Sequence, residues 1–226
     1  MIKKTTFTIL FLLMGFGGFA QDLYDINTIQ DIRIVFAESN WDALLDAQAA
    51  STEDYIPAQS VTINGTVFNN VGVKYKGNST YSPTRVKNPF HIELDTYQSQ
   101  NYQGYTDIKL SNVYFDPSFL REPLSYAILR QYMDAPLCNY ANVYVNGTLI
   151  GLYTSAESIS KKFVDEHFYS NNNAFFKCNP IGGAGPGSSS YPNLAYLGTD
   201  ITSYQTAYEM NSTTGWEDLV TLTNTL

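Results

Sequence analysis

The residue types that most often do chemistry are scarce in this chain, which contains two histidines and two cysteines. His91 and His167 stand alone, and neither has a Cys or His partner at the spacing of a zinc site. Cys138 and Cys178 either form a disulfide, as in oxidising compartments, or remain two separate buried thiols. The sequence also lacks the G-x-S-x-G, H-E-x-x-H and G-x-x-x-x-G-K patterns. Generic motifs therefore point to no reaction and predict no metal ligand.

A longer series of short motifs, in a fixed order, is more informative. The series is K-G-N-S-T at 76–80, K-N-P-F-H-I-E-L-D at 87–95, D-P-S-F-L-R-E-P-L at 116–124, V-Y-V-N-G at 143–147, G-L-Y at 151–153, Glu157 and Phe163. It resembles the CotH family, the spore-coat-protein-H kinases, over roughly residues 31–180. That family has a basic residue before G-N-S-S, a Lys before an aromatic strand, D-x-S-F-L-R-N on a helix, and Y-V-N-G-x-x-x-G-L-Y-x-x-x-E.

The resemblance implies a nucleotide site in a divergent protein-kinase-like fold. Such an enzyme mostly positions ATP and neutralises its charge. By resemblance, Lys76, Ser79 and Lys87 lie where the family forms a strand–loop–strand over the phosphates, and Glu157 occupies the acidic position after G-L-Y. Of these four residues, Lys87 and Glu157 are the two most expected to act at the nucleotide site. The plainer alternatives are solvated lysines, a simple turn at the G-N-S segment, and a glutamate that caps the next helix.

The motifs that carry catalysis in the family are missing. Active members have, near their C-terminal half, an Asn-x-Asp segment with the catalytic Asp and a Trp-Asp-x-Asp segment that binds metal. The C-terminal half of this sequence contains neither. The nearest string, W-E-D at 216–218, has the wrong spacing. We therefore assign no catalytic and no metal-binding residue here, and expect ATP and Mg²⁺ to act only in the complete protein. The chain is either a fragment or a naturally shortened relative, and a final helix without a cap favours the fragment.

The sequence is compatible with two functions. The first is the nucleotide-binding, N-terminal part of a secreted kinase that phosphorylates Ser or Thr of exported proteins. The alternative is a non-catalytic extracellular binding or adhesion module of a surface or polysaccharide-degrading assembly. The 18 tyrosines would suit such contacts, although most tyrosines serve the core and its rim. Whether the protein is an enzyme is therefore not decided by the sequence.

The helices and strands expected around these residues indicate an α+β fold, with a mostly antiparallel sheet and a few packed helices. Alternating patterns predict strands at 31–36, 71–76, 89–94 and 107–110. Asn-Gly pairs at 64–65 and 146–147 predict two hairpins. Helices are expected from Ser39 or Asn40, from Ser160 to Phe168, and from Trp216. The best helix should begin at Asp116 with Pro117 in its first turn and bury an apolar stripe, namely Phe119, Leu120, Leu124, Ala127, Ile128 and Tyr132.

The beginning of the chain and its charge suggest where it works. Residues 1–20 read as a signal peptide: Lys3 and Lys4 precede an apolar run too short to span a membrane, and small residues allow cleavage after Ala20. A CotH-like domain, incomplete at its C-terminus, would occupy 21–226, with no membrane span and a secreted or cell-surface location. The net charge of −8 and the absence of a basic run argue against nucleic acid as a partner. The glycine-rich stretch 180–190 is expected to be a loop.

Overall fold

The computed structural model describes residues 22–77, 79–170, 172–179 and 192–226. The expected signal peptide, Asn78 and the stretch 180–190 lie outside these residues. Seven strands form the larger part of the fold: β1 (Ile29–Val35), β2 (Ile56–Ile63), β3 (Thr66–Tyr75), β4 (Phe90–Glu93), β5 (Asp107–Ser111), β6 (Cys138–Val145) and β7 (Thr148–Ala156). The helices are α1 (Trp41–Ala49), α2 (Arg121–Leu129), α3 (Lys161–Phe168) and α4 (Trp216–Thr225). A short sheet pairs β8 (Phe176–Cys178) with β9 (Tyr208–Met210).

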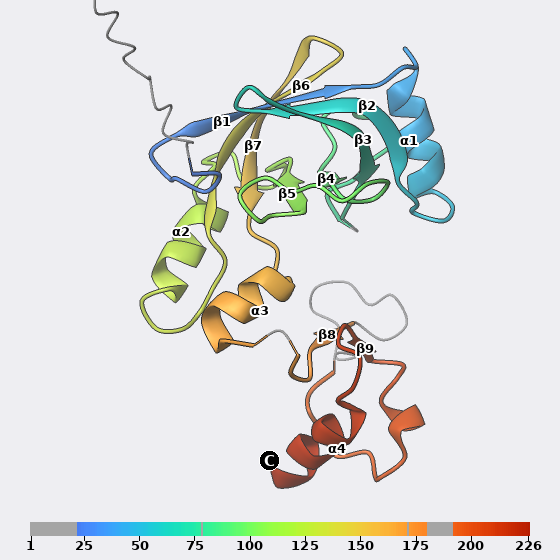
Figure 1. Cartoon of the computed structure of the whole chain (residues 1–226), viewed down its shortest axis with the longest axis vertical. Helices are drawn as coiled ribbons and strands as arrows, with labels where there is room; N and C mark the ends of the chain where they lie inside the picture. Colours follow the sequence, from blue (N-terminus) through green and yellow to red (C-terminus); the bar gives the residue numbers. More distant parts are fainter. Residues whose placement is uncertain (1–21, 78, 171, 180–191) are drawn as a thin grey trace, which may run out of the picture.

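The seven strands close into a barrel in the order β1-β2-β3-β4-β5-β7-β6 (Figure 1). Neighbouring strands are antiparallel except at the closure, where β1 and β6 run parallel and Ile32 faces Val143. The α+β class and the mostly antiparallel pairing are thus confirmed. The closure itself was not foreseen. It pairs the backbone groups that an edge strand would leave open.

Both Asn-Gly turns form as predicted, and both attach to β1. Asn64 and Asn146 adopt positive φ, as does the glycine that follows each of them. The side-chain oxygen of Asn64 accepts a hydrogen bond from the backbone N of Asp31 at 2.9 Å, near one end of β1. The oxygen of Asn146 accepts one from the backbone N of Phe36 at 2.8 Å, just past the other end. The two turn asparagines therefore fix the position of β1 in the barrel.

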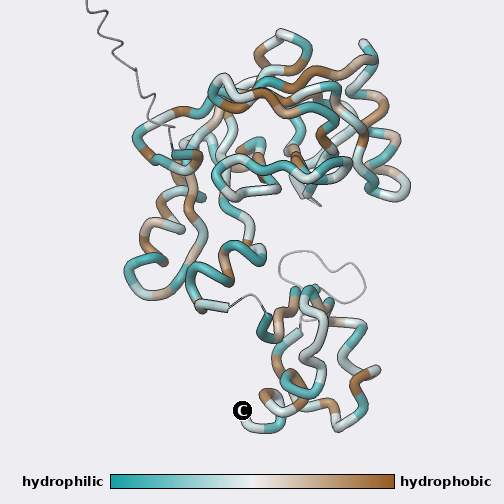
Figure 2. The backbone as a smooth tube through the Cα atoms, viewed as in Figure 1, coloured by the Kyte–Doolittle hydropathy of each residue, from teal (hydrophilic) through white to brown (hydrophobic). Residues whose placement is uncertain are grey.

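Alternation along the strands fills the barrel interior. In β4, Phe90 and Ile92 are fully buried, whereas His91 and Glu93 are only partly buried. The ring of Phe90 packs against Tyr75 and Tyr153, with centroids 5.2 and 5.9 Å away. The barrel strands carry long hydrophobic stretches in Figure 2. Burial of these apolar side chains is the main contribution to the stability of the barrel.

The helix predicted from Asp116 begins later and buries less than expected. Asp116 instead holds a turn, because its carboxylate accepts backbone hydrogen bonds from Ser118 at 3.1 Å and Arg121 at 2.8 Å. Phe119 takes a left-handed conformation, φ 59°, which delays the helix until Arg121. Within α2 only Pro123 is buried. The expectation of a buried stripe is wrong: the exposed members are Leu120, Leu124, Ala127, Ile128 and Tyr132.

The described residues after α3 form a separate small cluster (Figure 1). It contains the β8–β9 sheet and α4, which begins at Trp216 as predicted. Its core consists of Tyr204, Ala207, Tyr208 and Leu219. α3 also begins as predicted, with Ser160 at its N-cap position. In the part of the chain that the structure describes, no helix combines the length and hydrophobicity needed to cross a bilayer.

Candidate functional site

A cavity of about 560 Å³ lies between one end of the barrel, α2 and the β8–β9 cluster. Four charged residues of the barrel side line it: Lys76, Lys109, Glu122 and Glu157. Aromatic rings contribute from both sides, since Tyr126 belongs to α2 and Phe176 to β8. Its size is that of a small-molecule site, and it combines apolar walls with a few charges.

Lys76 and Lys109 give the cavity its positive charge. Lys76 directly follows β3, and its backbone N is held by the carbonyl of Pro89 at 3.0 Å. Burial lowers the pKa of the Lys76 ammonium, the charge of Lys109 lowers it further, and the charge of Glu122 opposes both. Two ammonium groups that line one partly buried cavity repel each other, so an anion bound between them would be favourable.

The two glutamates are both engaged in the protein. Glu122 lies in the first turn of α2 and accepts a hydrogen bond from the hydroxyl of Thr154 in β7. Glu157 follows β7 and is almost completely buried. Its carboxylate accepts the backbone N–H of Leu137 at 3.0 Å, while its own N–H donates to the Leu137 carbonyl at 2.8 Å. Each carboxylate therefore fixes a cavity wall as well as contributing charge.

The four site residues expected from the sequence do not all meet. Lys76 and Glu157 line the same cavity, but Lys87 and Ser79 are not among its lining residues. The Lys87 ammonium lies 5.1 Å from the centroid of the Phe119 ring and 5.2 Å from that of Tyr153, and burial lowers its pKa. Ser79 is exposed.

Sequence reasoning missed Lys109 and Glu122 on the barrel side of the cavity and Lys177 of β8. Lys109 lies in a strand that was predicted, and the alternation of β5 places it opposite the buried Ile108 and Leu110. Nothing local indicated that this face of β5 adjoins Lys76. Glu122 stands at the position where the family's D-x-S-F-L-R-N motif has Asn, so the resemblance did not single it out. Its contact with Thr154, 32 residues later, depends on the packing of α2 against β7.

Both cysteines are free thiols in the structure. Cys138 is buried in β6, and burial, followed by the charge of Glu122, raises the pKa of its thiol to about 12. Cys178 is exposed in β8 and lines the cavity. The two thiols therefore differ sharply in their access to reagents.

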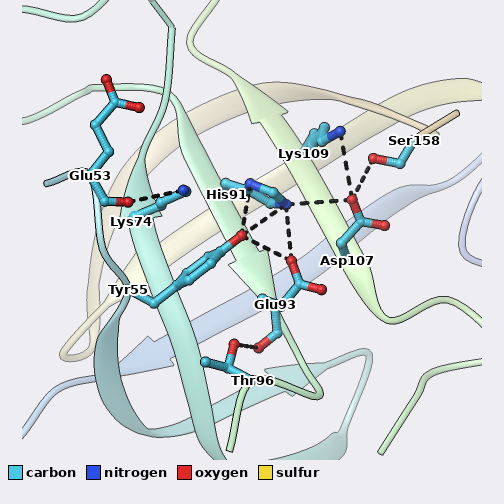
Figure 3. Close-up of polar contacts among 9 residues, drawn as sticks. All are labelled: Glu53, Tyr55, Lys74, His91, Glu93, Thr96, Asp107, Lys109 and Ser158. Atoms are coloured by element: carbon cyan, nitrogen blue, oxygen red, sulfur yellow. Dashed lines mark hydrogen bonds and ion pairs between the residues drawn. The ribbon is translucent and has the colours of Figure 1, made fainter. Parts of the chain in front are cut away.

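A second polar cluster lies beside this cavity, on the outer face of β4 and β5 (Figure 3). His91 Nε2 is 3.4 Å from a carboxylate oxygen of Glu93 and 3.4 Å from one of Asp107. The Tyr55 hydroxyl is 3.1 Å from His91 Nδ1 and donates to Glu93 at 2.9 Å. Burial raises the pKa of Glu93 to about 7 and lowers that of His91. His91, which stands alone in the sequence, thus has two carboxylate neighbours in the fold.

Comparison with known proteins gives the family. A search of curated proteins finds no match. A family model described as CotH kinase protein matches residues 73–226, which is more than half of the chain and includes Lys76, Lys109, Glu122 and Glu157. The match agrees with the resemblance seen in the motifs between 76 and 163. The chain therefore belongs to the CotH kinase protein family.

Proposed function

We propose that the cavity binds the phosphates of ATP and that the chain is the nucleotide-binding part of a secreted CotH-type kinase. The observation that carries this proposal is the presence of Lys76 and Lys109 in one cavity with Glu122. ATP would supply the phosphoryl group for transfer. In protein kinases a strand lysine and a helix glutamate cooperate at the nucleotide, and the divergent kinase-like fold implied by the family would use Lys76 and Glu122 in this way.

The charged and aromatic side chains that line the cavity suit a nucleotide. Lys76 and Lys109 would neutralise phosphate oxygens. Glu122 would orient the Lys76 ammonium, because the charge of Glu122 favours the protonated form of Lys76 and opposes the effect of burial on its pKa. Tyr126 and Phe176 offer apolar surface for a base. Lys177, from β8, adds a further positive charge at the wall.

The same residues fit Mg²⁺ less well. Glu122 and Glu157 are the two carboxylates that line the cavity, and each already accepts a hydrogen bond within the protein. We therefore assign nucleotide binding to this chain, and no metal-dependent step. Transfer to Ser or Thr of exported proteins belongs to the proposal only for a protein that also carries the Asn-x-Asp and Trp-Asp-x-Asp segments. Export through residues 1–20 is likewise part of the proposal.

Calorimetric titration of the whole chain with ATP tests the proposal. A charge-assisted hydrogen bond contributes about 1.5–3 kcal/mol, so Lys76→Met and Lys109→Met should each weaken ATP binding by about tenfold to 100-fold. Lys87→Met is the matched control, because methionine preserves the packing of the side chain against Phe119 and Tyr153. Weakening by Lys87→Met alone would move the site to the lysine favoured by the sequence. No ATP binding by the unaltered chain would support the non-catalytic binding module instead.

A further inference from the structure

Two strands bring one histidine and two carboxylates to the same outer surface of the barrel. Phe90 and Ile92 point into the core, so His91 and Glu93 share the opposite face of β4. Asp107 of β5 lies directly opposite Glu93 in the strand register. Like charges in directly opposed positions destabilise a sheet unless something compensates them. A positive partner at this point would therefore stabilise the sheet.

The spacing of the three ligand atoms suits a metal ion. The imidazole Nε2 lies 3.4 Å from each carboxylate oxygen, and all three atoms lie within 4.8 Å of one another. Zn²⁺ bonds to nitrogen and oxygen are about 2.0–2.2 Å long, so ligand atoms of a tetrahedral site are about 3.3–3.6 Å apart. An ion can enter with small side-chain adjustments.

Neighbouring side chains already orient the ligands (Figure 3). The Tyr55 hydroxyl donates to Glu93, and its oxygen can accept from His91 when Nδ1 carries the ring proton. In that tautomer the Nε2 lone pair faces the two carboxylates, as metal binding requires. The Ser158 hydroxyl donates to Asp107. Partners of this kind hold the ligands of known metal sites in place.

Protein cations compensate the cluster only in part. Lys109 Nζ is 3.7 Å from the Asp107 carboxylate. Lys74 is directed elsewhere, since its ammonium donates to the carbonyl of Glu53 at 2.9 Å and lies over the Tyr55 ring. We propose that His91, Glu93 and Asp107 form a binding site for a divalent transition metal of the Zn²⁺ class, with the remaining coordination position open to water. Imidazole with carboxylates favours such ions over Mg²⁺ or Ca²⁺.

The test is calorimetric titration of the metal-free chain with Zn²⁺ and with Mg²⁺, in the absence of nucleotide. We expect one Zn²⁺ per chain and much weaker binding of Mg²⁺. Tyr55→Phe removes an orienting partner and should weaken Zn²⁺ binding by about 10- to 100-fold, and His91→Ala should weaken it more. His167→Ala is the matched control, because among the described residues His167 contacts a single carboxylate, that of Asp134, at 3.0 Å. It should leave Zn²⁺ binding unchanged.

The absorption spectrum of the Co²⁺-substituted protein provides a second measurement that does not depend on activity. A visible ligand-field spectrum that disappears in Glu93→Gln, with the folded state checked by circular dichroism, supports the site. Binding of Zn²⁺ that survives both His91→Ala and Glu93→Gln would overturn the proposal. So would the absence of Zn²⁺ binding by the unaltered chain. Neither result bears on ATP binding at the neighbouring cavity, so the two proposals fail separately.

Discussion

The loop between β3 and β4 carries Lys87, and the side chain of Asn88 holds it together. This side chain is fully buried. Its oxygen accepts the backbone N–H of Ser82 at 3.0 Å, and its amide donates to the carbonyls of Ser82 at 2.9 Å and Arg85 at 2.6 Å. Asn88→Ala removes all three hydrogen bonds and leaves the backbone groups of Ser82 and Arg85 without these hydrogen-bond partners.

The loss of these three contacts sets the expected loss of stability. At about 1 kcal/mol for each hydrogen bond, Asn88→Ala should lower the free energy of unfolding by about 3 kcal/mol. For a chain of this size that corresponds to a fall in Tm of about 6–12 °C. Asn88→Asp should cost at least as much at pH 7, because it would turn a carboxylate oxygen toward the two carbonyls that now accept from the amide.

Urea unfolding followed by circular dichroism measures the difference, with Asn69→Ala as the control. Asn69 is an exposed asparagine of β3, so its replacement should change the free energy of unfolding by less than about 0.5 kcal/mol. A loss below about 1 kcal/mol for Asn88→Ala would refute the reasoning. It would mean that water replaces the lost contacts and that the loop does not depend on Asn88.

Three further outcomes are expected. Phe90→Ala should destabilise the fold by about 3–5 kcal/mol in the same assay, because the ring is fully buried among aromatic neighbours, whereas Val67→Ala at an exposed position should have little effect. In metal-free protein, burial raises the pKa of Glu93, which faces Tyr55, Asp95 and Asp107, from 4.5 to about 7. The folded state therefore holds a proton that the unfolded chain has released, so stability falls as pH rises from about 4.5 to about 7, and Glu93→Gln should flatten this dependence in urea unfolding. A thiol reagent should modify one cysteine quickly, and Cys178→Ser should abolish that phase because Cys138 is buried. A disulfide would leave no reactive thiol at all.

Local chemistry made several elements predictable. The Asn-Gly turns at Asn64 and Asn146 require positive φ, which few other residue pairs accept readily, so both hairpins were found from the sequence. Helices α3 and α4 begin where Ser160 and Trp216 indicated. The start of α2 was misjudged because Asp116, a good helix cap, holds a turn that Phe119 ends in a left-handed conformation.

Contacts between distant segments were not predictable in the same way. The parallel pairing of β1 with β6 joins residues more than a hundred positions apart, and no periodicity reports it. The candidate site depends on such contacts, since Lys76, Lys109 and Glu157 come from three different strands or their ends. Family resemblance found Lys76 and Glu157. It did not find Lys109, whose importance comes only from where β5 lies.

The attachment of β1 at both ends has a consequence for biosynthesis. The hydrogen bond from the backbone N–H of Phe36 to the Asn146 side chain joins residues 110 positions apart. A ribosome adds that many residues in roughly 5–20 s. During that interval the nascent chain can form the local β2–β3 hairpin and pair β1 with β2, but the other side of β1 has no partner. An unpaired strand edge readily recruits other chains. The delay before β6 emerges is therefore the period in which newly made chains most need protection from one another.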